Sequence, residues 1–236
     1  MTNRNKTARL AGLLYLILVI SGILNLMYIP SQIIVWGNPA QTVENIIRSE
    51  MLFRLGIASG IVTFLTFMVL PLVLYRLLKE VDKTYALLMV VFALVSIPLS
   101  FVNMLNKFSI LTLIGNEAYL KTLDASELQF QVMFYLDSYN NGLSVSQIFW
   151  GLWLFPFGYL VYKSGFLPKI LGIILMLGCF GYLVKFFGKL LFEGYADSAL
   201  SNIAGLPASV GEIGICLWLL VLGTNTIKMK RKIVNT

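Results

Sequence analysis

The sequence predicts an all-α polytopic membrane protein, a bundle of six transmembrane helices, and three observations support that prediction. Of the 236 residues, 58% are hydrophobic and only 12% are charged, whereas a water-soluble domain carries roughly 25% charged residues. The mean hydropathy is +0.83. Six separate stretches stay apolar over the roughly 20 residues that an α-helix needs to cross a bilayer core of ~30 Å. This composition excludes an ordinary soluble enzyme.

The six predicted spans use most of the chain and leave only short tails and loops. The spans are residues 10–29, 55–78, 85–105, 142–162, 170–190 and 207–224. No extramembrane domain fits in the remainder, so we expect a single transmembrane helical domain over residues 1–236. The two longest gaps look partly helical. Thr42 is expected to cap a short helix, and Asp124 with Glu127 forms a capping box for a helix that continues into the fourth span.

The distribution of Lys and Arg predicts that the N- and C-termini are both cytoplasmic, because basic residues concentrate in the inner loops of membrane proteins. With that orientation only Glu80 and Asp82 of the 11 acidic residues lie inside. Most of the 18 basic residues then lie inside too: Arg4, Lys6, Arg9, Arg76, Lys79, Lys83, Lys163, Lys169, Lys228, Lys230, Arg231 and Lys232. The net charge of +7 suits anionic membrane lipids as partners. A nucleic-acid partner is not expected, because no basic stretch has the interleaved aromatic residues of such a surface.

Small residues at helical spacing predict close helix contacts on three spans. The pairs are Gly56 with Gly60, Gly178 with Gly181, and Gly211 with Gly214. Small side chains let helix backbones approach in lipid, where packing replaces the hydrophobic driving force. The alternative is that glycine is simply frequent in membrane helices.

Polar side chains within the spans gather at one depth. At 1.5 Å per residue, Asn25 and several others fall in the outer third of the bilayer core, with further polar residues at its outer rim. Ionisable groups inside a bilayer are costly and tend to face the bundle interior or a wet cavity. We call this layer the polar cup and take it as the candidate ligand-binding site: Arg54, Asn103, Lys107, Asp137, Asn141, Gln147, Lys185, Lys189 and Glu212.

An ion pair between Lys185 and Glu212 is the most specific structural expectation. The two residues lie at matching depth on the predicted fifth and sixth spans, which run antiparallel. Two alternatives remain open. Lys185 and Lys189 would instead snorkel to the outer headgroups, or Glu212 would cap the sixth span in an S-x-x-E box that begins at Ser209.

Residues for catalysis or metal binding are scarce. Histidine is absent and cysteine occurs twice, so the commonest general base and the usual zinc ligands are missing. No Walker A loop, G-x-S-x-G elbow or H-E-x-x-H motif is present. We therefore predict no catalytic residues, no metal site and no cofactor.

One segment resembles a known family. Residues 149–154 (FWGLWL) and 158–172 (GYLVYKSGFLPKILG), followed by Leu206-Pro207-Ala208, Glu212 and Leu217-Trp218, are similar to the hallmark of the bacterial DUF4386 family of multi-pass membrane proteins. Leu52-Phe53-Arg54 and residues 74–78 (LYRLL) also fit. The resemblance implies an integral protein of the bacterial cell (inner, plasma) membrane without an established activity, and it supplies no catalytic residue.

Three functions are consistent with these observations. The first is binding of a small amphipathic or lipid-like molecule, with Arg54, Lys107, Lys185 and Lys189 facing an anionic headgroup. The second is a structural or regulatory membrane subunit without chemistry. The third is a membrane-embedded lipid-modifying enzyme, for which Asp137 and Glu212 are the candidate proton-transfer groups. The sequence does not indicate an oligomeric state.

Overall fold

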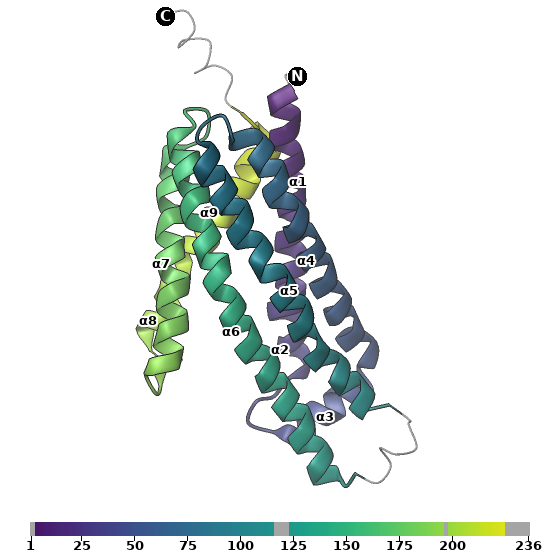
Figure 1. Cartoon of the computed structure of the whole chain (residues 1–236). Helices are drawn as coiled ribbons and strands as arrows, with labels where there is room; N and C mark the ends of the chain where they lie inside the picture. The colour runs from purple at the N-terminus through teal and green to yellow at the C-terminus, as the bar shows by residue number, and fades with distance from the viewer. Residues whose placement is uncertain (1–2, 116–122, 196–197, 225–236) are drawn as a thin grey trace, which may run out of the picture. The chain divides into compact units, whose positions relative to one another are not determined.

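The computed structural model describes residues 3–115, 123–195 and 198–224, and within these ranges the secondary structure is helical, with no strand (Figure 1). The elements are α1 (Asn3–Ile23), η1 (Leu24–Tyr28), α2 (Ile29–Ile33), α3 (Pro39–Arg48), α4 (Glu50–Leu78), α5 (Lys83–Leu113), α6 (Ala125–Lys163), α7 (Lys169–Leu191), α8 (Ala199–Ala204), α9 (Leu206–Leu217) and η4 (Trp218–Leu222).

Six helices are long and apolar enough to cross a membrane, which confirms the predicted number of spans. They cover Asn3–Ile33, Glu50–Leu78, Lys83–Leu113, Ala125–Lys163, Lys169–Leu191 and Ala199–Leu222. Each contains most or all of the corresponding predicted span. Several run beyond it, because helices continue after the apolar stretch ends. The 39 residues of α6 extend over about 58 Å, well beyond a ~30 Å core.

The capping box predicted at the start of α6 is present. The carboxylate of Asp124 accepts a hydrogen bond from Glu127 N at 2.8 Å, and Glu127 Oε2 accepts one from Asp124 N at 3.1 Å. These bonds satisfy two of the backbone donors that every helix start leaves unpaired. They also hold the pKa of the exposed Asp124 carboxyl below its usual value, because both donors favour the charged form.

The short helix α3 exists, but its predicted cap is wrong. Asn38 caps α3, its side chain accepting from Gln41 N at 3.0 Å. Thr42 is fully buried inside α3 and bonds back to Val35, accepting from Val35 N at 2.9 Å and donating to Val35 O at 3.0 Å. Thr42 therefore fixes the preceding loop to the helix.

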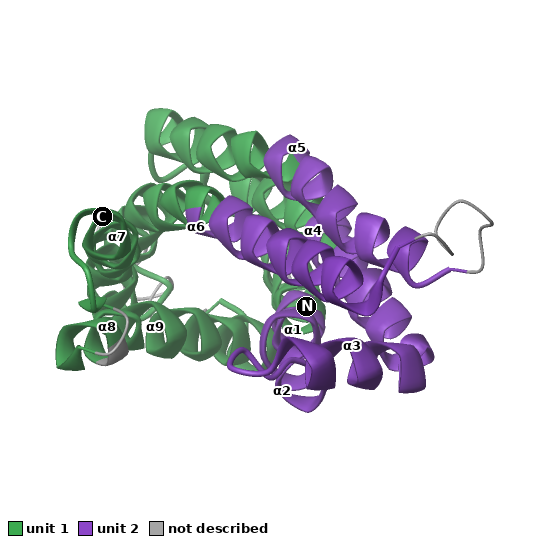
Figure 2. Ribbon diagram, turned by 90° about the horizontal axis from the view of Figure 1, so that it is seen from below, with its two compact units in different colours: residues 1–17, 66–97, 145–236 green, residues 18–65, 98–144 purple. Residues whose placement is uncertain are grey.

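The chain divides into two compact units, which Figure 2 colours separately. Unit 1 comprises residues 1–17, 66–97 and 145–236, and unit 2 comprises residues 18–65 and 98–144. Helices α1, α4, α5 and α6 each contribute one segment to each unit. The single domain expected over residues 1–236 stays a prediction.

Unit 1 has an aromatic core. Tyr15, Trp153 and Phe157 are almost fully buried. The ring centroids of Trp153 and Phe157 lie 5.2 Å apart, and Phe67 meets Trp153 edge-on at 5.1 Å. Such offset and edge-to-face contacts add to the area that the rings bury. They join the start of α1, the end of α4 and the end of α6.

Helices α7, α8 and α9 pack side by side in unit 1 (Figure 1), and their glycines lie at the contacts. A Cβ on Gly178 would lie 2.8 Å from Ala208 Cα, and one on Gly181 would collide with the carbonyl oxygen of Ala204. Gly211 packs on Leu175 in the same interface. The glycine pairs predicted on the fifth and sixth spans are therefore real backbone contacts.

The beginning of the first span and the end of the sixth span meet within unit 1. Thr224 N donates to Asn5 Oδ1 at 3.0 Å, and Arg9 Nη2 donates to Val221 O at 3.4 Å. These side chains occupy backbone groups that the end of η4 leaves unpaired. The basic residues Lys228, Lys230, Arg231 and Lys232 lie outside the described residues.

Candidate functional site

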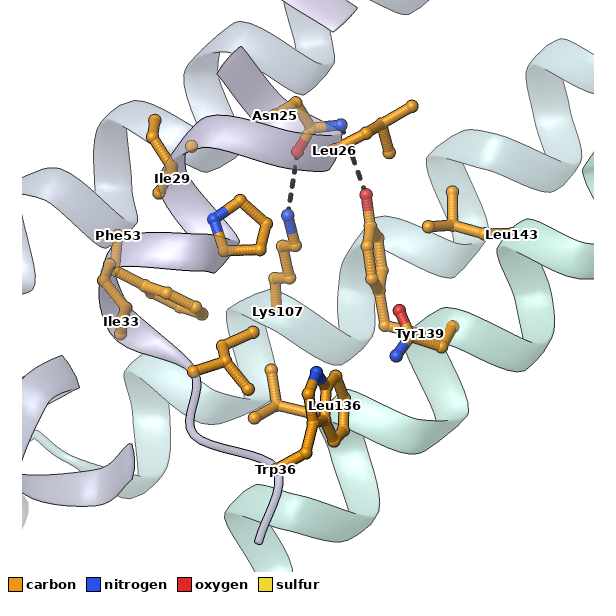
Figure 3. A pocket seen from close by; sticks show the side chains of 14 residues that line it. Asn25, Leu26, Ile29, Ile33, Trp36, Phe53, Lys107, Leu136, Tyr139 and Leu143 are labelled. Atoms are coloured by element: carbon orange, nitrogen blue, oxygen red, sulfur yellow. Dashed lines mark hydrogen bonds between the residues drawn. The ribbon is translucent and has the colours of Figure 1, made fainter. Parts of the chain in front are cut away.

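Unit 2 contains a cavity of about 170 Å³ beside a buried lysine (Figure 3). Its wall is mostly apolar, from η1, α2, the following loop and segments of α4, α5 and α6. The lining residues are Asn25, Leu26, Ile29, Pro30, Ile33, Ile34, Trp36, Phe53, Gly56, Lys107, Leu136, Tyr139, Asn140 and Leu143. An apolar wall with a few convergent polar groups is the usual make-up of a small-molecule site.

Lys107 supplies the positive charge of this cavity. Its side chain comes from α5 and is 5% exposed. Lys107 Nζ donates to Asn25 Oδ1 at 2.8 Å and lies 4.2 Å from the centroid of the Tyr139 ring (Figure 3). The ring face stabilises a cation through its quadrupole.

Asn25 is placed by a turn of π-helix. It belongs to η1, in which the backbone N–H of Ile29 reaches back five residues to Leu24 O, and its side chain is fully buried. Single π-turns inside α-helices occur frequently at functional sites. Gly60 of α4 leaves room for the amide, since a Cβ there would lie 3.0 Å from Asn25 Nδ2. The predicted glycine contact at Gly60 therefore makes space for a polar group.

Tyr139 and Asn103 complete the polar network from α6 and α5. Asn25 Nδ2 donates to the Tyr139 hydroxyl at 3.3 Å. Asn103 Nδ2 donates to the backbone oxygen of Tyr139 at 2.8 Å, and Asn106 Nδ2 donates to Asn103 Oδ1 at 3.0 Å. Gly142 allows this approach, because a Cβ there would collide with the Asn103 amide. The network therefore ties α1, α5 and α6 together around Lys107.

The charge of Lys107 has no counter-ion in the part of the chain that the structure describes. No carboxylate of those residues lies within 4.0 Å of its Nζ, and Asn25 is a neutral partner. Burying a cation without a paired anion costs several kcal/mol even after relaxation. An anion in the cavity would repay this cost by Coulomb attraction at low dielectric.

The loop between α2 and α3 forms part of the cavity wall. Trp36 and Ile34 of this loop line the cavity, and the Trp36 ring is half-exposed at its edge. Thr42 anchors the loop at Val35, and Asn45 Nδ2 donates to Ile33 O at 3.0 Å. The loop is thus held by α3 while Trp36 itself remains free of those anchors.

The polar-cup residues of unit 2 separate into two groups. Asn103 and Lys107 belong to the buried network. Arg54 pairs with Glu50 at 2.7 Å, and both side chains are exposed. Asp137 and Asn141 are also exposed, and neither lines the cavity.

The other four predicted residues, Gln147, Lys185, Lys189 and Glu212, belong to unit 1. There Glu212 is half-buried, and its Oε1 accepts a hydrogen bond from the Tyr15 hydroxyl at 3.1 Å. The Tyr182 hydroxyl also bonds to this carboxylate. Glu212 thus has two tyrosine partners from α1 and α7.

The expected ion pair between Lys185 and Glu212 is not formed. Gly178 faces Ala208 and Gly211 faces Leu175, so Glu212 stands opposite the residues next to Leu175. Lys185 lies about 16 Å farther along α7, where its side chain passes Gly205. The depth estimate failed because the returning chain already packs on α7 from Ala199, through α8, and not from Pro207. The cap at Ser209 is also wrong, since α9 begins at Leu206.

Comparison with known proteins decides the family. The profile described as "Domain of unknown function (DUF4386)" matches residues 10–223. The chain belongs to this family. An uncharacterized protein of the archaeon Archaeoglobus fulgidus is 35% identical over 88 residues, which are 37% of this chain and 50% of that protein. The match thus spans about half the length of the curated relative, and no solved structure matches.

The most important residues that sequence reasoning missed in this DUF4386 protein are Asn25 and Tyr139. Asn25 is recognisable by depth as part of the polar layer, but its direction depends on a π-turn that has no sequence signature. Tyr139 stands next to Asn140 and Asn141 and resembles an interfacial tyrosine. Among the described residues no group of three His, Cys, Asp or Glu side chains could hold a metal ion.

Proposed function

We propose that this DUF4386 protein is a multi-pass protein of the cell membrane that binds a small amphipathic anion in the cavity of unit 2, with Lys107 as the counter-ion. The observation that carries the proposal is a 95% buried lysine, faced by neutral groups, at the wall of a mainly apolar cavity. A charge of this kind is rare within a membrane and marks a functional site by default.

The placement of the site also supports a lipid-side ligand. Unit 2 contains the end of the first and third spans and the beginning of the second and fourth. With cytoplasmic termini, as the basic residues predict, these segments belong to the outer half of the membrane. Leu26 and Trp36 line the cavity and are 37% and 49% exposed, so an apolar tail has a path to the acyl chains.

Binding alone is the activity that the chemistry supports. Lys107, Asn25 and Tyr139 offer hydrogen-bond donors and one charge, but the cavity lining includes no carboxylate, thiol or histidine. General acid–base or nucleophilic catalysis on a lipid would need a proton-transfer group that is suitably placed. We therefore place a lipid-modifying enzyme behind a binding protein.

Tryptophan fluorescence offers a direct test. The full-length protein, purified in a neutral maltoside detergent, is titrated with a brominated twelve-carbon carboxylate, because bromine quenches nearby indoles. We expect saturable quenching that is lost in Trp36→Phe, since Trp36 lines the cavity. Lys107→Met should abolish saturation, whereas the matched control Lys79→Met, at an exposed lysine outside unit 2, should bind normally. Equal quenching in both lysine variants would refute the proposal.

A further inference from the structure

The donors and charges in the unit 2 cavity restrict the ligand further. Lys107 has the one charged side chain among the cavity-lining residues, and the other polar side chains, Asn25, Tyr139 and Asn140, are neutral. A monoanion would neutralise the site. A dianion, such as a phosphate monoester above its second pKa of about 6, would leave one negative charge in an apolar enclosure, where burial of an unpaired charge is costly.

The hydrogen-bond directions in the network leave a second donor for the ligand. An ammonium group can only donate, so Asn25 must present Oδ1 to Lys107 and its NH₂ to the Tyr139 hydroxyl. The Tyr139 oxygen then accepts, and its own hydrogen remains to be donated. Because Lys107 and Tyr139 bond to the two ends of the same amide, their donors lie side by side at the cavity (Figure 3).

Size limits the part of the ligand that enters. Sites that enclose a drug-sized molecule measure about 300–1,000 Å³, and this cavity measures about 170 Å³. It suits a terminal head and the first carbons of one chain. The remainder of the chain would leave past Leu26 and Trp36, which connect the wall to the surface.

From these three points we infer that the ligand is a single-chain amphiphile with a terminal carboxylate, whose two oxygens accept hydrogen bonds from Lys107 Nζ and the Tyr139 hydroxyl. This inference rests on the proposed function and specifies its ligand class. Two adjacent donors match the two oxygens of one carboxylate. A phosphodiester carries substituents on both sides of its charge and cannot enter as a terminal group.

Competition against the brominated probe tests the inference at pH 8. The competitors are dodecanoate, dodecyl phosphate, dodecanol and vesicle-derived phosphatidylglycerol, all with the full-length protein in maltoside. We expect dodecanoate to displace the probe at concentrations at least tenfold below the other three. Dodecyl phosphate or phosphatidylglycerol displacing the probe as well as dodecanoate, in a Lys107-dependent way, would overturn the carboxylate inference and leave the proposed function standing. Probe binding that ignores Lys107 would instead remove the proposed function.

A Tyr139→Phe variant tests the second donor. Losing a hydrogen bond to a charged group should lower the affinity for dodecanoate about tenfold. The readout is the ratio of dodecanoate to dodecanol affinity, because a general loss of structure lowers both affinities together. Tyr135→Phe is the matched control, since Tyr135 is on the same helix and does not line the cavity. An unchanged ratio in Tyr139→Phe would contradict the two-donor arrangement.

Discussion

At the scale of single residues, Lys107 is a position at which stability and function oppose each other. Its burial without an anion is unfavourable, and it gives up only one hydrogen bond, to Asn25, when it is removed. A residue kept for structure alone would instead stabilise the fold. Lys107 therefore separates a binding protein from a purely structural subunit.

We predict that Lys107→Met does not destabilise the protein. Removing the buried charge should offset the roughly 1 kcal/mol lost at Asn25, so the midpoint of unfolding should stay the same or rise. Chemical unfolding in mixed micelles measures this, with Lys79→Met as reference. A loss of more than about 2 kcal/mol would show that Lys107 holds the fold together.

Glu212 shows the opposite behaviour because its partners are structural. Replacing it with Leu leaves the hydroxyls of Tyr15 and Tyr182 without their acceptor, which should cost about 2–4 kcal/mol. Glu212→Gln keeps an acceptor oxygen and should cost less than about 1 kcal/mol. The same unfolding assay compares the two variants. Equal costs would mean that the hydroxyl contacts do not decide the role of Glu212.

At the scale of elements, the contact between α7 and α9 depends on glycine at Gly181. A Cβ there meets the backbone oxygen of Ala204, which cannot move without shifting α8 and α9. We expect Gly181→Ala to lower the free energy of unfolding by at least about 2 kcal/mol. Gly22→Ala is the control, because its nearest neighbour is a Thr63 methyl at 3.9 Å, and alanine should stabilise this helix by about 0.5–1 kcal/mol. Similar losses in both variants would contradict the packing described.

The start of α6 gives a pH-dependent prediction. The pKa of Asp124 is lowered in the folded state, so its cap contributes above the unfolded pKa of about 4 and is lost as the pH falls through the folded value. We expect faster amide exchange at residues 125–128, measured by hydrogen exchange, below about pH 3 or in Asp124→Asn at pH 7. Exchange that is insensitive to both changes would show that the cap does not hold this end.

These elements also show what a sequence can predict. Apolar length and turn chemistry predict the six spans and the capping box at Asp124, because both signals are local. The π-turn at Asn25 and the displaced pairing of Lys185 with respect to Glu212 arise from packing between distant segments. Tyr139 is missed for the same reason, since only the fold brings it to Lys107.

At the scale of the whole molecule, the meeting of Asn5 with Thr224 places the start of the first span and the end of the sixth on one side. We predict that this side is cytoplasmic. Both native cysteines, Cys179 and Cys216, are buried, so single introduced cysteines report cleanly. A membrane-impermeant maleimide added to intact cells should label Gln41→Cys in α3 and leave Lys79→Cys unlabelled. The reverse pattern would invert the topology and place the cavity toward the cytoplasm.

The central claim is that Lys107 is the counter-ion of a bound amphipathic anion, and the ¹³C NMR signal of carboxyl-labelled dodecanoate tests it most directly. Added to the full-length protein in maltoside, the label should give a bound carboxyl resonance distinct from that of the micelle. We predict that this resonance is present in Lys79→Met and absent in Lys107→Met. The same bound resonance in both variants, or none in the unmodified protein, would contradict the account.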